Sequence, residues 1–155
     1  MAASKLSFRT ATREDLPAIV RMLADDGLGR GREQPVDPLP RAYGDAFDGM
    51  AAQPGNDYLL AEIDGEVAGC LQLTVIHGLS RTGMSRALIE GVRVAASHRG
   101  QGVGEALFGE AIERARSEGC GLVQLTTDKA RPDALRFYER LGFTASHEGM
   151  KLTLS

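Results

Sequence analysis

The 155-residue sequence has no tryptophan, only two cysteines and three histidines, and no long apolar run. With so few cysteines and no apolar segment at its start, the sequence predicts a reducing, cytoplasmic location. A membrane span needs roughly 18 consecutive apolar residues, which no stretch approaches, so we expect no membrane partner. The histidines do not have a metal-ligand spacing, and we therefore expect no metal.

A strong charge of one sign is also lacking. Eighteen basic side chains against 21 acidic ones give a net charge of −3. Nucleic-acid binding usually requires a basic surface, so this balance argues against a nucleic-acid partner. A chain of this length buries about 70% of its unfolded surface and can hold its own core. We therefore expect residues 1–155 to form a single domain.

Hydrophobic periodicity predicts a mixed α/β order of strands and helices. One helix is expected to begin after Thr12, and another at Pro132. A third is expected around residues 41–50, and a fourth from Val103 to a stop at Gly119. Strands are expected over residues 6–10, 57–63, 66–76, 86–95, 122–126, 143–146 and 149–153. The pair Asp64-Gly65 predicts a tight hairpin between two of these strands. The strand, helix and strand from residue 86 to 126 predict a right-handed parallel crossover.

The most informative segment runs from Val92 to Glu105. An apolar strand leads into Arg99 and three alternate glycines, Gly100, Gly102 and Gly104, and a helical pattern begins at once. Glycines present successive N–H groups without a Cβ in the way, and a helix N-terminus adds partial positive charge. The segment therefore predicts a loop that holds a phosphorylated cofactor. The alternative is a tight turn without a ligand.

The spacing of the loop narrows the choice of cofactor. A dinucleotide motif would need glycine at position 105, where the chain has Glu105, and the Gly-Lys-Ser/Thr of a Walker loop is missing. A nucleotide-binding α/β protein is therefore disfavoured. The spacing that is present is Arg-x-x-Gly-x-Gly, from Arg99 to Gly104, and a second block downstream reads Phe137-Tyr138-Glu139-Arg140-Leu141-Gly142-Phe143.

The two blocks, in this order, resemble the GNAT family of N-acetyltransferases. The first resembles that family's acyl-coenzyme A signature, Gln/Arg-x-x-Gly-x-Gly/Ala, and the second its Phe-Tyr-x-x-x-Gly-Phe block. The order of elements over nearly the whole chain is also similar. The resemblance implies a GNAT-like α/β (α+β mixed) fold, with a mainly antiparallel sheet of six to seven strands flanked by about four helices. It also implies acetyl-CoA as co-substrate and direct attack of an amine on the thioester.

The resemblance implies which residues contact the coenzyme. The diphosphate would lie on backbone N–H groups of the loop, and the strand before it would pair with the pantetheine amides and supply an oxyanion donor. Arg131 stands where members often carry Asn, and its guanidinium would serve phosphate instead. The expected coenzyme contacts are Val92, Arg93, Val94, Arg99, Gly100, Gln101, Gly102, Val103, Gly104, Glu105, Arg131 and Phe137.

Tyr138 is the predicted general acid. A phenol with a reference pKa of about 10 is protonated at neutral pH and can give a proton to a thiolate. The alternative is a core tyrosine, since Tyr138 shares an apolar helix face with Ala134, Phe137 and Leu141.

Glu90 is the candidate general base. With a two-residue period, Leu88, Glu90, Val92 and Val94 share one face of a strand. A carboxylate among aliphatic side chains is costly unless paired, and its desolvation favours proton uptake. The alternative is an exposed glutamate whose phase is flipped by a bulge at Gly91. His77, at a strand end, is the next candidate base.

The cysteines, the histidines and an acidic segment each allow a structural interpretation as well as a functional one. Cys70 and Cys120 lie among apolar or small residues and are expected to be inert thiols rather than nucleophiles. His77, His98 and His147 are expected at turns or on the surface, although His98 adjoins the phosphate loop. Residues 25–55 carry a net charge of −3. If they wall the acceptor site they favour cationic amines, and otherwise they form a solvated loop.

The sequence therefore predicts an N-acetyltransferase that uses acetyl-CoA. The acceptor is expected to be a small-molecule or peptide amine, and because many family members are dimers the resemblance allows a homodimer. Two alternatives remain: a non-catalytic acyl-CoA-binding or regulatory domain, and transfer of a longer acyl group.

Overall fold

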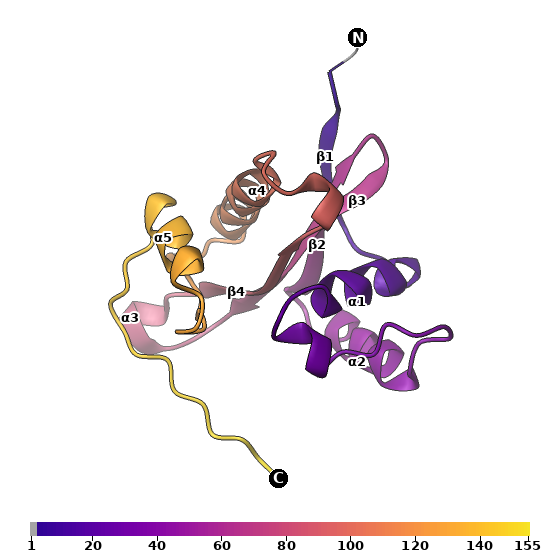
Figure 1. Ribbon diagram of the computed structural model, residues 1–155. Coiled ribbons are helices and arrows are strands. Elements are labelled where there is room, and N and C mark those ends of the chain that lie inside the picture. Colours follow the sequence, from indigo (N-terminus) through magenta and orange to yellow (C-terminus); the bar gives the residue numbers. More distant parts are fainter. Residues whose placement is uncertain (1–2) are drawn as a thin grey trace. The chain divides into compact units, whose positions relative to one another are not determined.

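The computed structural model describes residues 3–155 (Figure 1). The chain divides into two compact units, one ending at Gln124 and the other beginning at Leu125. The first unit contains the sheet and the helices α1 to α4, and the second contains α5.

A five-stranded sheet forms the centre of the first unit, with the strands side by side in chain order. Three neighbouring pairs are antiparallel, and the last pair, β4 with β5, is parallel. The strands are β1 (Leu6–Thr10), β2 (Asn56–Ile63), β3 (Glu66–Ile76), β4 (Arg86–Val94) and β5 (Leu122–Gln124). Asp64 and Gly65 join β2 to β3 with φ of 51° and 83°, which confirms the predicted hairpin. The mixed fold and its parallel crossover are also confirmed.

The predicted strands at residues 143–146 and 149–153 are wrong, so the sheet has five strands and not six or seven. Within the described chain, residues 143–155 contain no helix or strand. Met150, Leu152 and Leu154 alternate with polar residues as in a strand, yet each is at least 86% exposed. Alternating apolar and polar residues are typical of a strand with one buried face, but the pattern does not supply a neighbouring strand. An extended segment without backbone hydrogen bonds to a neighbour is not a β-strand.

The four predicted helices are confirmed. They are α1 (Leu16–Ala24), α2 (Arg41–Ala51), α4 (Val103–Ser117) and α5 (Pro132–Arg140). The sequence did not predict α3 (Ser80–Gly83), a single turn between β3 and β4 in which Arg81 and Thr82 have positive φ. A 3-10 turn over Arg13–Asp15 leads directly into α1.

The core lies on both faces of the sheet, with α1 and α4 on opposite sides (Figure 1). On one face, a Cβ at Gly69 would lie 3.2 Å from Val103 and 3.6 Å from Leu107, which shows that α4 packs closely on β3. On the other face, α1 packs on β2 and β3 through a cluster of Ala11, Ile19, Met22, Leu60 and Cys70. On the α1 side, residues 35–40 of the irregular segment before α2 line a hollow together with Leu16 and Arg21 of α1.

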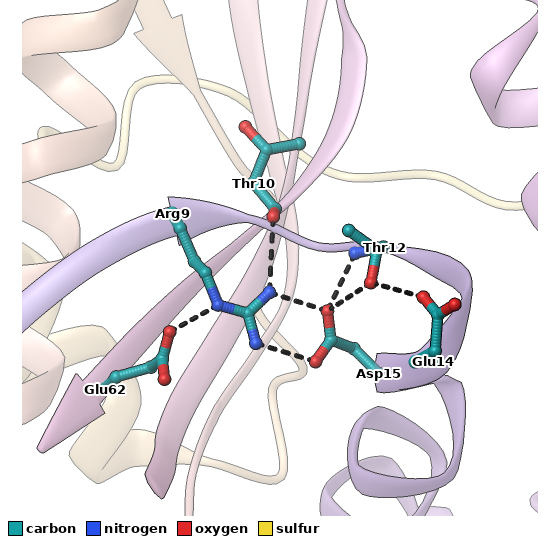
Figure 2. Close-up of polar contacts among 6 residues, drawn as sticks. All are labelled: Arg9, Thr10, Thr12, Glu14, Asp15 and Glu62. Atoms are coloured by element: carbon teal, nitrogen blue, oxygen red, sulfur yellow. Dashed lines mark hydrogen bonds and ion pairs between the residues drawn. The ribbon is translucent and has the colours of Figure 1, made fainter. Parts of the chain in front are cut away.

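A charged network fixes β1 to the start of α1 (Figure 2). Arg9 donates two hydrogen bonds to Asp15, of 2.7 and 2.8 Å, and its Nε contacts Glu62 on β2. Asp15 also accepts the backbone N–H of Thr12 at 2.7 Å. The hydrogen bonds from Arg9 are the main reason that the pKa of Asp15 lies below its usual value.

We expect Asp15→Asn to lower the free energy of unfolding by about 2 kcal/mol at pH 7. Removing one partner of a buried pair costs about 3–5 kcal/mol, but Arg9 is partly exposed and keeps Glu62, so the loss is smaller. The native carboxylate stabilises the fold fully above its unfolded pKa of about 3.9, and this contribution is lost as the pH falls through the lower folded pKa. Urea unfolding from pH 7 to pH 2 should therefore show the two proteins converging in acid. A constant difference across that range would contradict this assignment, and Asp57→Asn, on the exposed start of β2, is the control.

Candidate active site

The loop between β4 and α4 has the backbone that its glycines predict. After the 3-10 turn Ala96–His98, Gly100 and Gly102 adopt φ of 77° and 78°, and Gly102 precedes the first residue of α4. An ideal Cβ at either glycine would meet nothing within 4 Å. The glycines are therefore needed for the left-handed backbone conformation and not because space is short.

The loop and the first turn of α4 present a run of unused donors. No side chain caps the helix, and in residues 3–155 no protein group accepts a hydrogen bond from the backbone N–H of residues 99 to 105. The first three N–H groups of a helix cannot bond within it, and the helix dipole makes this end partially positive. These residues can therefore bind an anion such as a phosphate.

Arg99 connects this loop to the end of α1. Its Nη2 lies 3.2 Å from the backbone oxygen of Asp25 and 3.3 Å from Oδ2 of the same residue, and its Nε donates to the carbonyl of Val94 at 3.2 Å. The guanidinium is therefore shared with a carboxylate, which the sequence did not predict. About half of each side chain is exposed, so the charge can also reach a ligand in solvent.

The outer edge of β4 is open beside the loop. β5 pairs with β4 only from Arg86 to Leu88, so in the described chain the rest of β4 has no strand neighbour on that side. Ala95 donates its N–H to Ala68 of β3, and so the N–H and C=O of Val94 point away from β3, toward the open edge. The carbonyls of Val92 and Val94 accept hydrogen bonds from Arg93 and Arg99, which leaves the Val94 N–H facing the edge.

A β-bulge at Gly91 corrects one prediction. Gln72 lies opposite Glu90 and Cys70 lies opposite Arg93, so β4 has one extra residue between these pairs, and Gly91 has a φ of 60°. Residues directly opposite share a face, so Glu90 and Arg93 face α1 together, whereas Val92 and Val94 face the other side. The expectation that Leu88, Glu90, Val92 and Val94 share one face is wrong, because the extra residue shifts the alternation. Glu90 is also exposed and not buried among aliphatic side chains.

Glu90 belongs to a row of polar residues across the sheet. Gln72 of β3 lies opposite Tyr58 of β2 on one side and opposite Glu90 of β4 on the other. We call these three residues the polar row. Gln72 donates to Oδ1 of Asn56 at 2.9 Å. Sequence analysis missed Tyr58 and Gln72, because only the pairing of the strands brings them beside Glu90. No local signal in the sequence marks them, since each of these strands also contains other polar or charged residues.

Arg93 is placed next to the polar row by an ion pair. Its Nε lies 2.8 Å from Oδ2 of Asp26, and both side chains are largely buried. The contact is not aligned as a hydrogen bond, so the buried Nε–H has no acceptor in line. Asp26 also accepts the backbone N–H groups of Leu28 and Gly29. The side chain of Arg93 therefore fixes the segment after α1, and its backbone N–H and C=O point toward β3 and not toward the open edge.

In the second unit, Tyr138 lies on α5 between two phenylalanines. Its ring centroid is 5.6 Å from that of Phe137 and 6.1 Å from that of Phe143, both in edge-to-face geometry. Tyr138 and Phe137 are partly buried. Arg131 is partly buried at the N-cap of α5, where its backbone N–H donates to the carbonyl of Asp128 at 2.9 Å. The predicted apolar face of this helix thus contains the Tyr138 ring.

The other titratable residues have surroundings close to those predicted. Cys70 is buried, and burial raises its pKa to about 12, so this thiol is inert. His77 is exposed and His98 is half-buried, and each contacts a serine hydroxyl through Nδ1. No cluster of three His, Cys, Asp or Glu side chains suited to a metal occurs in residues 3–155. None of the helices described there is long and apolar enough to cross a membrane.

Comparison with known proteins identifies the family of this arrangement. The family model described as Acetyltransferase (GNAT) family matches residues 20–143. An aminoalkylphosphonate N-acetyltransferase of Salmonella typhimurium is 36% identical over 110 residues, which are 69% of this chain and 69% of that protein.

Two solved structures are similar over nearly the whole chain. A crystal structure titled as a transcriptional regulator from Bacillus halodurans C-125 is 51% identical, with a TM-score of 0.93 over 97% of this chain and 100% of that one. A protein titled as a putative acetyltransferase from Agrobacterium tumefaciens is 28% identical, with a TM-score of 0.84 over 96% of this chain and 99% of that one.

Proposed function

This chain belongs to the acetyltransferase (GNAT) family and is an acyltransferase, and we propose that it transfers the acetyl group of acetyl-CoA to a primary amine by direct attack. The observation that carries the proposal is the run of unused N–H donors over residues 99–105, beside the open edge of β4. A diphosphate needs such donors, and an extended amide chain needs such an edge. We further propose that residues 1–155 act as one domain.

The residues present fit the coenzyme that we propose. Gly100 and Gly102 leave the loop without side chains where a phosphate would approach, and Arg99 adds a half-exposed cation. The N–H of Val94 faces the open edge and is the proposed donor to the thioester oxygen. Acetyl-CoA supplies the activated acetyl group, and the protein's part is to hold it and to move two protons. The other residues that we propose to contact the coenzyme are Gln101, Val103, Gly104, Glu105, Arg131 and Phe137.

Glu90 and Tyr138 are the proposed proton carriers. An alkylamine with a pKa of about 10.4 is almost fully protonated at pH 7, so attack requires that a base remove a proton from its nitrogen. Glu90 is exposed on the α1 face of β4 and can take that proton directly or through water. Tyr138 is the proposed donor to the departing thiolate.

The proposed acceptor is a small molecule that carries a primary amine. The Salmonella relative is named for a small aminoalkyl substrate, which supports this class, and a peptide amine is the alternative. Transfer of an acyl group longer than acetyl is compatible with the same loop. The two free cysteines suit a reducing cytoplasm, where we propose that the protein acts.

A regulatory role is the second candidate function, because the 51% identical structure is titled as a transcriptional regulator. In that case the coenzyme would bind without turnover, and Glu90 would have no catalytic role. The net charge of −3 does not favour direct contact with nucleic acid.

The experiment that separates these functions measures free thiol released from acetyl-CoA with a panel of amines between pH 6.5 and pH 9, for the native chain and for Glu90→Gln. We expect amine-dependent thiol release by the native chain. The variant should lose kcat/KM by about 10²-fold at low pH, and by less as the pH rises, since solvent then supplies neutral amine. Glu66→Gln, at the exposed start of β3, is the control for the change of charge.

Two results would contradict these assignments. Coenzyme binding without thiol release for any amine would favour the regulatory function. An unchanged pH profile in Glu90→Gln would remove Glu90 as the base and make His77 the next candidate.

A further inference from the structure

Residues 150–155, which we call the arm, expose apolar side chains in the pattern of a strand. The arm is extended, and Met150, Leu152 and Leu154 alternate along it with polar residues (Figure 1). These three side chains are 91%, 87% and 86% exposed. A strand with one apolar face shows this alternation, and in a folded protein that face is normally covered. The arm therefore has the pattern of a strand but lacks a cover for its apolar side.

The start of the arm lies against other residues of the second unit. An ideal Cβ at Gly149 would lie 3.4 Å from Cγ2 of Thr126, so the backbone passes close to that side chain. Oε2 of Glu148 lies 3.6 Å from Nζ of Lys129. Beyond these contacts, no backbone hydrogen bond joins the arm to another residue in the described part of the chain. The arm therefore begins beside Thr126, and its own N–H and C=O groups can pair with a partner.

The first unit has an unused sheet edge at β5. This strand is the last of the sheet and pairs with β4 only. Apart from that ladder, its three residues take part in no backbone hydrogen bond within residues 3–155. Two of its side chains are half-buried and the third is exposed. An edge strand with unpaired N–H and C=O groups is a template on which another extended segment can pair.

An exposed apolar side chain belongs to the loop that adjoins the start of this edge. Leu79 is 95% exposed, and apart from the arm no other large apolar side chain in residues 3–155 exceeds 56%. The N–H of Gly83 donates to the carbonyl of Leu79 at 3.0 Å and closes the turn that carries it. The same loop reaches β5, because Gly121 donates its N–H to the carbonyl of Ser85 at 2.8 Å. The open edge and an uncovered apolar side chain therefore occur at the same end of the sheet.

We propose that two copies of this chain form a dimer by exchanging their arms, so that the arm of each copy pairs along β5 of the other and covers Leu79. Each copy supplies one arm and one edge, and a symmetric pair leaves neither unpaired. Six extended residues span about 20 Å and the three of β5 about 10 Å, so the arm also reaches the adjoining loop. In one chain the arm is not a strand, and in the dimer it becomes an added strand of the neighbouring sheet. The assembly does not depend on the proposed reaction.

Sedimentation equilibrium of the 155-residue chain tests the assembly. At micromolar concentration we expect a mass of twice the 16.6 kDa of one chain. Leu152→Lys places a charge in the middle of the apolar side of the arm, and a dimer contains this change twice. It should raise the dissociation constant by about 100-fold or more, since two leucines are no longer buried. Thr153→Lys adds the same charge on the polar side of the arm and is the control, whose dimer should persist.

A mixing experiment separates the exchange of arms from other modes of pairing. Leu79→Lys changes the receiving surface and leaves the arm intact, so we expect this variant to dissociate as well. In an equimolar mixture with Leu152→Lys, the intact arm of one variant meets the intact edge of the other. The mixture should therefore associate about tenfold more tightly than either variant alone. Association no tighter than that of Leu79→Lys alone would show that the arms pair with each other, and would overturn the exchange.

Hydrogen exchange locates the pairing in the dimer. Amides of β5 and of the arm should be protected in the native chain and should exchange faster in Leu152→Lys. Circular dichroism of that variant should be unchanged, because the altered side chain is exposed within one chain. A native chain that is monomeric at micromolar concentration would overturn the proposal, whether or not its arm is protected. A dimer that survives Leu152→Lys would have its interface elsewhere and would overturn it as well.

Discussion

Tyr138→Phe should lower kcat by about 10²- to 10⁴-fold, the range that general acid–base catalysis contributes. The phenol is the proposed source of the proton that the departing thiolate of coenzyme A takes up. Steady-state rates of thiol release at saturating acetyl-CoA and amine measure the loss directly. Turnover equal to that of the native chain would make Tyr138 a packing residue only.

The fold of the Tyr138 variant should be unchanged, because a phenylalanine keeps the ring contacts with Phe137 and Phe143. Circular dichroism and the shift in Tm on adding acetyl-CoA check this. A variant that has lost both rate and coenzyme binding would be a structural defect, and would not identify the acid.

Gly102→Glu should abolish binding of acetyl-CoA. At about 100-fold saturation the coenzyme should stabilise the native chain by about 2.7 kcal/mol, which appears as a rise in Tm. A glutamate at position 102 places a carboxylate at the N-terminus of α4, where the diphosphate would bind, and repels it. The rise in Tm should therefore disappear, while NAD and ATP should give little shift with either protein. A rise in Tm equal to that of the native chain would place the phosphates elsewhere.

The matched control is Gly119→Glu, after the other end of α4. Gly119 has a φ of 79°, and a Cβ there also meets nothing within 4 Å, so both variants have the same backbone strain in open space. We expect both to lose about 1 kcal/mol of stability, as a side chain in the left-handed region usually costs. Only the change at Gly102 should affect the coenzyme.

Two residues directly after α1 form ion pairs with both parts of the proposed site in the first unit, the coenzyme loop and strand β4. Asp25 pairs with Arg99 of the coenzyme loop, and Asp26 pairs with Arg93 beside the polar row. Two consecutive carboxylates therefore connect one turn of the chain to the loop proposed to hold the coenzyme and to the strand β4 beside its bulge.

The sequence by itself determined the features that depend on neighbouring residues. Helical and strand periodicity predicted four of the helices and the five strands of the sheet, and Asp64-Gly65 predicted the hairpin because few residues tolerate the required positive φ. The alternate glycines before Val103 predicted the donor-rich start of α4 for the same local reason. The family followed from two short blocks whose spacing is also local.

Only the tertiary structure decided the features that depend on pairing between distant segments. The bulge at Gly91 is a mismatch in register between β3 and β4, and it separates Glu90 from Val92 and Val94, which a two-residue period puts together. The polar row exists because Tyr58 and Gln72 happen to lie opposite Glu90, and no local pattern fixes that register. The alternation of apolar and polar residues around Leu152 did not produce a strand for the same reason. A β-strand needs backbone hydrogen bonds to a neighbouring strand, and the sequence of one segment does not determine whether such a neighbour is present.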